Sequence, residues 1–118
     1  MKMIFIQYPS CSTCKKALKF LKEYEATVEI RHIVEETPTV EELKEWIIQS
    51  GEPFTKFFNT SGVVYREMGL KDRVKHMDLE EAVSLLAENG MLIKRPLLIA
   101  ENQVVIGFKE DKYKQLFN

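Results

Sequence analysis

A chain of 118 residues with 45% hydrophobic and 30% charged residues is long enough to bury one core and too apolar to be disordered. Its formal net charge of -1 gives no reason to expect direct contact with nucleic acid or with an anionic membrane. The first apolar run, Met3 to Ile6, is too short for a membrane span or a signal peptide. We therefore expect one domain over residues 1–118, a cytoplasmic location and a monomer.

The first third of the chain predicts a strand, a helix and a second strand. Met3–Gln7 is a short apolar run that a proline ends. From about Ser12 to Tyr24 the apolar residues recur at helical spacing, and lysines occupy the other side. Val28–Val34 carries β-branched residues in partial alternation, which is typical of a strand. A strand–helix–strand unit implies parallel strands joined by a right-handed crossover.

The middle of the chain predicts helices. Thr39 and Glu42 form a capping-box pair at the start of a helix, and Gly51 stands in the usual place just after its end. Residues 53–77 are expected to be irregular, with short helical pieces at 63–68 and 71–75. A clear helix follows between Asp78 and Asn89. We expect these helices to form an insertion over approximately residues 39–90.

The end of the chain predicts a β-hairpin and a last helix. Leu97–Ala100 and Val104–Ile106 read as strands joined by a three-residue turn, and a helix covers about Lys109–Phe117. The hairpin adds antiparallel strands to the parallel pair. The predicted fold is therefore α/β, a thioredoxin-like mixed four-stranded sheet flanked by helices, with a central helical insertion.

The two cysteines of the chain, Cys11 and Cys14, lie at the turn from the first strand to the first helix. A lasting disulfide staple is not expected in a reducing cytoplasm. Structural zinc needs four ligands, and no second cysteine pair follows, while His32 and His76 lie far apart. A pair of inert buried thiols fits an apolar run better than this turn. A C-x-x-C motif beside a βαβ pattern favours a redox pair.

The position of each thiol predicts its role. Spacing of three residues puts both side chains on one face of the helix, and Cys11 lies near the free backbone N–H groups at its N-terminus. That environment stabilises a thiolate, and Lys15 adds to it. We predict that Cys11 attacks and that Cys14 resolves the mixed disulfide. This chemistry needs no metal or cofactor, only an external thiol reductant such as thioredoxin or a low-molecular-weight thiol.

Arg95-Pro96 is the second feature, because it comes just before a predicted strand that faces the cysteines. A cis bond at Pro96 would expose backbone groups to an extended substrate. The fixed positive charge of Arg95 would lower the pKa of Cys11. The alternative interpretation of Arg95 is an ordinary surface ion pair.

Four segments resemble the ArsC/Spx family of thioredoxin-fold proteins over essentially the whole chain: YPSCSTCKKALKFL, FFNTSGVVYREMGL, NGMLIKRPLL and VIGFKED. The resemblance implies a cytoplasmic thiol–disulfide oxidoreductase that acts on protein or small-molecule disulfides and is recycled by a thioredoxin-type reductant. Its catalytic residues would be Cys11, Cys14 and Arg95. Ser12, Thr13 and Pro96, the last with a cis bond, would line the substrate groove.

Two other functions of this family remain alternatives. The first is a redox-sensing transcriptional regulator similar to Spx, which binds the C-terminal domain of the RNA polymerase α-subunit. The second is arsenate reduction, in which one cysteine, matching Cys11, acts with three arginines around the oxyanion. Arg95 matches one of these arginines, but the other two positions hold Asn59 and Phe108, the latter followed by Lys109. A small, doubly charged anion needs such donors, so we rank arsenate reduction last.

Overall fold

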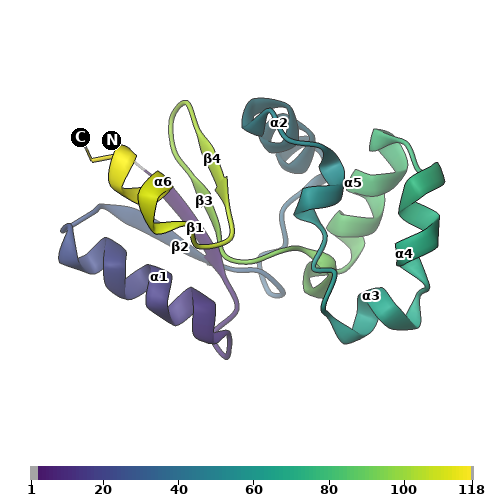
Figure 1. The fold of residues 1–118 in the computed structure, drawn as a ribbon, viewed down its shortest axis with the longest axis horizontal. Helices are drawn as coiled ribbons and strands as arrows, with labels where there is room; N and C mark the ends of the chain where they lie inside the picture. Colours follow the sequence, from purple (N-terminus) through teal and green to yellow (C-terminus); the bar gives the residue numbers. More distant parts are fainter. Residues whose placement is uncertain (1–2, 118) are drawn as a thin grey trace. The chain divides into compact units, whose positions relative to one another are not determined.

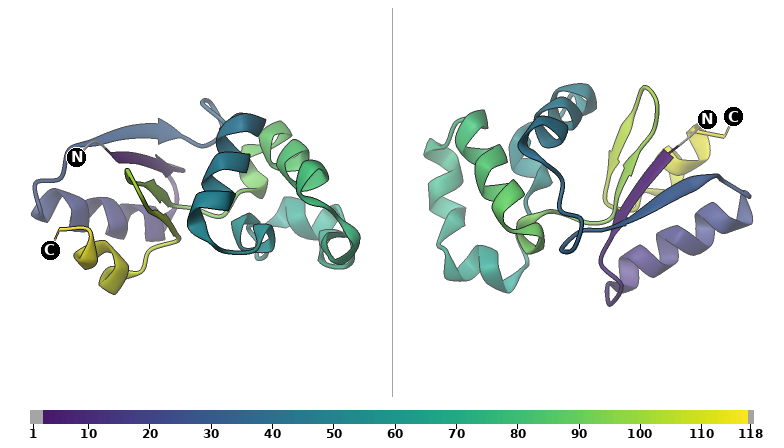
Figure 2. Two further views of the ribbon diagram at one scale, coloured as in Figure 1. Left: turned by 90° about the horizontal axis from the view of Figure 1, so that it is seen from above. Right: turned by 180° about the vertical axis from the view of Figure 1, so that it is seen from behind.

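The structure is a computed structural model that describes residues 3–117, drawn in Figures 1 and 2. The described chain divides into two compact units. The first, here called the sheet unit, comprises the residues up to His32 and those from Arg95 onward. The second, the helical unit, comprises residues 33–94. Along the sequence, the helical unit is therefore inserted between the two segments that build the sheet unit.

Within the described residues, four strands form one mixed sheet in the order β2-β1-β3-β4. The strands are β1 (Met3–Gln7), β2 (Val28–His32), β3 (Leu97–Ile99) and β4 (Val104–Ile106). β1 pairs in parallel with β2 and antiparallel with β3, which pairs antiparallel with β4. The predicted thioredoxin-like α/β fold is thus confirmed, although β2 and β3 end slightly earlier than the sequence indicates.

The register of β1 and β3 determines where the two predicted site segments lie on the sheet. Ile6 lies opposite Leu97, so the start of β3 is beside the end of β1. The segment after β1 and the segment before β3 therefore meet at the same edge of the sheet. Both predicted site segments, at the cysteines and at Arg95-Pro96, lie at this edge.

Two helices of the sheet unit, α1 (Ser12–Glu23) and α6 (Glu110–Gln115), form its apolar core together with the strands. Ala17 and Leu21 of α1 and Tyr113 of α6 are fully or almost fully buried, in one cluster with Phe5 and Leu98 of the sheet. Residues 17 and 21 are four apart, as the predicted helical stripe requires. The apolar face of α1 thus fixes the helix on the sheet and, with it, the position of its N-terminal cysteines.

The helical unit contains four α-helices in the described chain, together with short 3-10 helices. Their bounds are α2 (Val40–Ser50), η1 (Phe54–Phe57), α3 (Val63–Glu67), α4 (Leu70–Arg73), η2 (Val74–His76), α5 (Leu79–Glu88) and η3 (Gly90–Leu92). The capping box of α2 is present in both directions, with Thr39 and Glu42 exchanging hydrogen bonds at 3.0 and 3.1 Å. Gly51 closes this helix in the left-handed conformation, at φ 70°.

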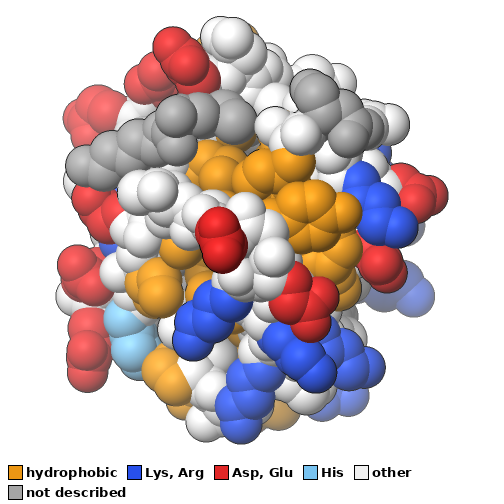
Figure 3. All heavy atoms as spheres, turned by 90° about the vertical axis from the view of Figure 1, so that its left-hand side faces the viewer, with side chains coloured by type: hydrophobic (Ala, Val, Ile, Leu, Met, Phe, Trp, Pro, Cys, Tyr) orange, Lys and Arg blue, Asp and Glu red, His pale blue; other side chains and the backbone are white. Residues whose placement is uncertain are grey.

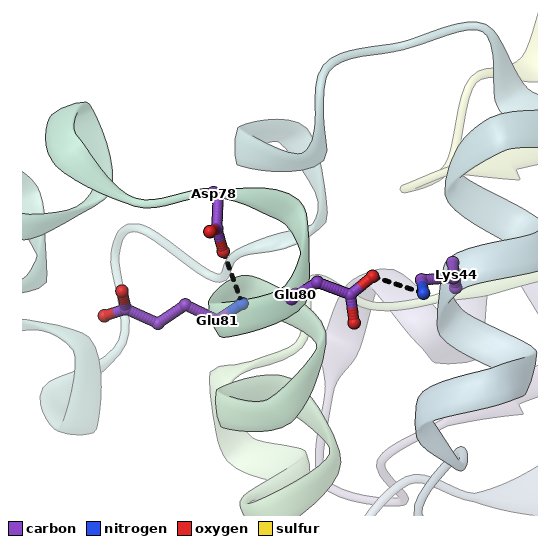
Figure 4. Close-up of polar contacts among 4 residues, drawn as sticks. All are labelled: Lys44, Asp78, Glu80 and Glu81. Atoms are coloured by element: carbon purple, nitrogen blue, oxygen red, sulfur yellow. Dashed lines mark hydrogen bonds and ion pairs between the residues drawn. The ribbon is translucent and has the colours of Figure 1, made fainter.

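Local contacts join the parts of the helical unit. Asp78 caps α5 by accepting the N–H of Glu81 at 2.9 Å, and Lys44 of α2 forms an ion pair with Glu80 of α5 (Figure 4). An isolated β-bridge between Phe58 and Ile93, not expected from the sequence, also joins segments far apart in the chain. No helix within residues 3–117 combines the length and the apolar character needed to cross a membrane.

Gly90 provides a test of packing in the helical unit. It is buried, and a Cβ added there would lie 2.1 Å from the carbonyl oxygen of Ile33, which is backbone and cannot rotate away. We predict that Gly90→Ala lowers the free energy of unfolding by about 2–3 kcal/mol, the range of an overpacked core. Gly51→Ala is the matched control, because it adds only the strain of a positive φ, about 1 kcal/mol. Urea unfolding of both variants measures the difference, and equal losses would contradict this account of Gly90.

Candidate active site

Cys11 is the N-cap of α1. After β1 the chain turns, and the N–H of Cys11 donates to the carbonyl of Tyr8 at 2.9 Å. Cys11 then adopts an extended conformation, with φ -79° and ψ 117°, and its Sγ accepts the backbone N–H of Cys14 at 3.3 Å. In most helices a serine, threonine, aspartate or asparagine oxygen makes this contact. Here the capping atom is a half-buried sulfur, so the residue that starts the helix is also a nucleophile.

The surroundings of Cys11 favour its thiolate. Burial raises the pKa of this thiol, but hydrogen bonds from the side chain and the backbone of Cys14 lower it. The positive charge of Arg95 and the backbone N–H of Thr13 lower the pKa further, and the net shift is below the ordinary value. No acidic residue occupies the first turn of α1 to oppose this effect. The predicted stabilisation at the helix terminus is therefore present, with Arg95 as an additional charge.

Cys14 has the opposite environment. It is fully buried in the first turn of α1. Burial, followed by its hydrogen bond to Cys11, raises the pKa of Cys14 to about 12, although Tyr8 and Arg95 oppose the shift. At neutral pH the inner thiol therefore keeps its proton while the outer thiol is the one inclined to lose it. This order agrees with an attacking Cys11 and a resolving Cys14, roles that stay predictions.

Arg95 belongs to the environment of the thiols. Its guanidinium carbon lies 5.2 Å from the centre of the Tyr8 ring, a cation–π distance, and its charge acts on both sulfurs. Within the described residues, its Nη1 atom is buried and has no hydrogen-bond acceptor. The alternative of an ordinary surface ion pair for Arg95 thus finds no support among residues 3–117.

The other predicted site residues lie around this centre. The Arg95-Pro96 peptide bond is cis, and the carbonyl of buried Pro96 accepts the N–H of Gly107 at 2.8 Å. Ser12 and Thr13 are exposed in the first turn of α1, directly after Cys11. The expectation that Ser12, Thr13 and Pro96 line a substrate groove stays a prediction.

Two tyrosines were missed by the sequence reasoning. Tyr8 contacts Arg95 and also lies edge-on to His32, with ring centres 5.7 Å apart. Tyr113 of α6 is buried, and its hydroxyl has no hydrogen-bond partner in the described chain. Burial and then the charge of Cys14 raise the pKa of Tyr113. Helical spacing would have placed Tyr113 in the core, but nothing in the sequence indicates that α6 brings it to Cys14.

Phe108, at one of the positions where the resemblance expects an arginine, serves the core instead. Its ring packs edge-on against Phe20 and Tyr113, with centres 5.7 and 4.9 Å apart. Within residues 3–117, no three His, Cys, Asp or Glu side chains are grouped so that they could hold a metal ion. Arg95 is the side chain of the sheet unit whose positive charge lowers the pKa of Cys11.

The fold and the site together define a thioredoxin-like protein with a C-x-x-C dithiol at the N-terminus of its first helix. The chain belongs to the ArsC family, whose model matches residues 6–116. It is 47% identical over 115 residues to the uncharacterized protein YusI of Bacillus subtilis, covering 98% of both chains. It is 30% identical over 115 residues to the regulatory protein MgsR of the same organism, covering 98% of this chain and 90% of that one.

A solved structure agrees with this assignment. The crystal structure of an ArsC-family-related protein from Bacteroides fragilis matches with a TM-score of 0.95 and 52% identity, covering 98% of both chains. Identity at this level shows a shared family and fold, whereas the activity must be argued from the site.

The pKa of Cys11 can be measured by the pH dependence of its alkylation by iodoacetamide, with mass spectrometry to identify the labelled cysteine. We predict that Cys11 reacts first and remains reactive below the pH range of an ordinary thiol, because its pKa is lowered. Arg95→Gln removes one cause of the shift, so its profile should move to higher pH. Lys112→Gln, which removes an exposed charge of α6, is the control. An unchanged profile in Arg95→Gln would disprove the role of Arg95.

Proposed function

We propose that the protein is a cytoplasmic thiol–disulfide oxidoreductase of the ArsC family that uses Cys11 and Cys14 as its redox pair. The observation that carries this proposal is the asymmetry of the two thiols. One sulfur caps a helix and has a lowered pKa, while its buried neighbour has a pKa raised to about 12. A structural pair of thiols has no need for that difference, whereas a two-step exchange reaction uses it.

The cycle transfers two electrons from the dithiol to a substrate disulfide. The Cys11 thiolate attacks one substrate sulfur, the substrate S–S bond breaks, and the first substrate thiolate leaves and takes up a proton. Cys14 then loses its proton, attacks the Cys11 sulfur of the mixed disulfide and releases the second substrate thiol. The protein is left with a Cys11–Cys14 disulfide. A thioredoxin-type dithiol, or a low-molecular-weight thiol, returns it to the starting state.

The neighbouring residues have supporting roles in this cycle. The Arg95 charge favours the Cys11 thiolate before attack. Exposed Ser12 and Thr13, with the backbone around Pro96, would contact the substrate chain on either side of its disulfide. We propose these contacts for protein and small-molecule disulfides alike.

Arsenate reduction remains the less favoured activity. The phenyl ring at position 108 lies in the aromatic core and offers no donor to an oxyanion. Position 59 holds an amide, not a cation. A single arginine suits a thiolate better than it suits a doubly charged anion, which needs several fixed donors.

Turnover of bis(2-hydroxyethyl) disulfide, coupled to thioredoxin, thioredoxin reductase and NADPH, tests the proposal. The wild-type chain should accelerate NADPH oxidation, and Cys11→Ser should reduce the rate to background because it removes the attacking sulfur. Cys14→Ser should instead accumulate a mixed disulfide at Cys11, visible as an added mass on the intact protein. If Cys11→Ser turns over as fast as wild type, the proposed function is wrong.

A redox-switched regulator is the second candidate, favoured by the 30% identity to the regulatory protein MgsR. In this case the same disulfide would act as a signal, and the partner would be the C-terminal domain of the RNA polymerase α-subunit, as the resemblance to Spx implies. Oxidised wild-type chain should then bind that purified domain more tightly than Cys11→Ser does, measured by titration calorimetry. Binding that is absent, or equal in the two proteins, would exclude this candidate.

A further inference from the structure

The solvent face of α1 carries four lysines beside the dithiol. Lys15, Lys16, Lys19 and Lys22 are all exposed, and this set is called the lysine stripe below. Lys15 follows Cys14 directly, and Lys22 is seven residues further along the helix, a rise of about 10 Å. The stripe therefore begins at the reactive cysteines and runs away from them along one helix.

The described chain does not neutralise the lysine stripe. None of its four members forms an ion pair within residues 3–117. In contrast, Lys114 of α6 pairs with Glu110 at 3.7 Å. In Figure 3, Lys and Arg side chains gather on the lower part of the face shown, below a hydrophobic area. Exposed cations without internal partners are available to an external one.

The arrangement also works against the helix that carries it. Lys15 and Lys19 are four residues apart, and Lys19 and Lys22 are three apart, so like charges are neighbours on the helix surface. Each such pair costs a few tenths of a kcal/mol in an isolated helix. Lys15 and Lys16 also lie toward the positive end of the helix dipole, with no acidic residue in the first turn. Only Lys22, in the last turn, suits the helix dipole, so stability of α1 does not explain the stripe as a whole.

Charge is divided unevenly between the two units, although the whole chain is nearly neutral. The sheet unit, residues 1–32 and 95–118, contains ten Lys and Arg against six Asp and Glu, a net charge of +4. The helical unit, residues 33–94, contains seven against twelve, a net charge of -5. These values add to the -1 of the chain. The unit that carries the thiols is thus cationic, and four of its ten cations form the lysine stripe.

We propose that the lysine stripe is a docking surface for an acidic protein, and that the disulfide that Cys11 attacks lies next to carboxylates on that partner. The inference rests on the proposed function and names its class of substrate. A partner that brings a disulfide to the N-terminus of α1 must face the residues that follow along that helix. Acidic side chains there would meet four exposed ammonium groups within about 10 Å, a Debye length at 0.1 M ionic strength. Such complementarity raises the rate of encounter.

Synthetic peptides supply the probes for the test. Three peptides share one intramolecular disulfide and differ only in whether its flanking residues are Glu, Gln or Lys. Uncharged bis(2-hydroxyethyl) disulfide is the reference for the chemistry of the dithiol itself. The readout is the second-order rate constant for oxidation of the reduced protein, at low and at high ionic strength.

Two variants with the same change in net charge separate the stripe from the general charge of the unit. Lys19→Gln/Lys22→Gln removes two charges from the stripe and leaves the residues next to the cysteines unchanged. Lys109→Gln/Lys112→Gln removes two exposed charges from α6, that of its N-cap residue Lys109 and that of Lys112 within the helix.

We expect the Glu peptide to react about 10-fold faster than the Gln peptide at low ionic strength, with the Lys peptide slowest, and salt should reduce these differences. The stripe variant should lose most of the preference, while the α6 variant should keep it. Equal rates for the Glu and Gln peptides, or equal losses in the two variants, would overturn the docking surface alone. If neither the peptides nor the uncharged disulfide oxidises the protein, the proposed function and the docking surface both fail.

Discussion

The hydrogen bond from the backbone N–H of Cys14 to the Sγ of Cys11 links the folding of α1 to the chemistry of the site. It satisfies a donor that would otherwise be unpaired at the helix N-terminus, so the helix begins where the sulfur lies. Hydrogen bonds to an ionised acceptor are stronger than those to a neutral one, so loss of the thiol proton strengthens the cap. Because Ala17 and Leu21 hold the same helix on the sheet, the sulfur is fixed by the core as well.

The same contact determines how the two thiols affect stability as pH changes. The folded-state pKa of Cys11 is lowered, so its contribution is present above the unfolded-state pKa and is lost as pH falls through the folded value. The folded-state pKa of Cys14 is raised to about 12, so its contribution is present below the unfolded value and is lost as pH rises toward 12. The fold thus favours the thiolate at Cys11 and the protonated thiol at Cys14.

The sequence predicted those features that depend on residues close together in the chain. The capping box at Thr39, the first helix (predicted from about Ser12 to Tyr24 and observed over Ser12–Glu23) and the location of Cys11 at a strand–helix turn are all of this kind. The contact between Arg95 and Tyr8 is different, because it depends on the antiparallel register of two strands that are about 90 residues apart in the chain. The position of Tyr113 near Cys14 likewise depends on how α6 packs on the sheet. Patterns of spacing carry no information about such contacts.

Electrostatics at this site acts over two distances. Hydrogen bonds from Cys14 and Thr13, with the partly buried charge of Arg95, act on Cys11 at short range, where salt screens little. The exposed lysines of α1 act through solvent, where salt screens strongly. In our proposals, the first group favours the reactive thiolate, and the second selects the molecules that reach it. The net charge of the whole chain does not reveal the cationic sheet unit. That unit is assembled from both ends of the sequence, and the helical unit between them in the sequence is acidic. The docking proposal therefore predicts that relatives with the same dithiol and the same short-range contacts differ in substrate through the exposed face of α1.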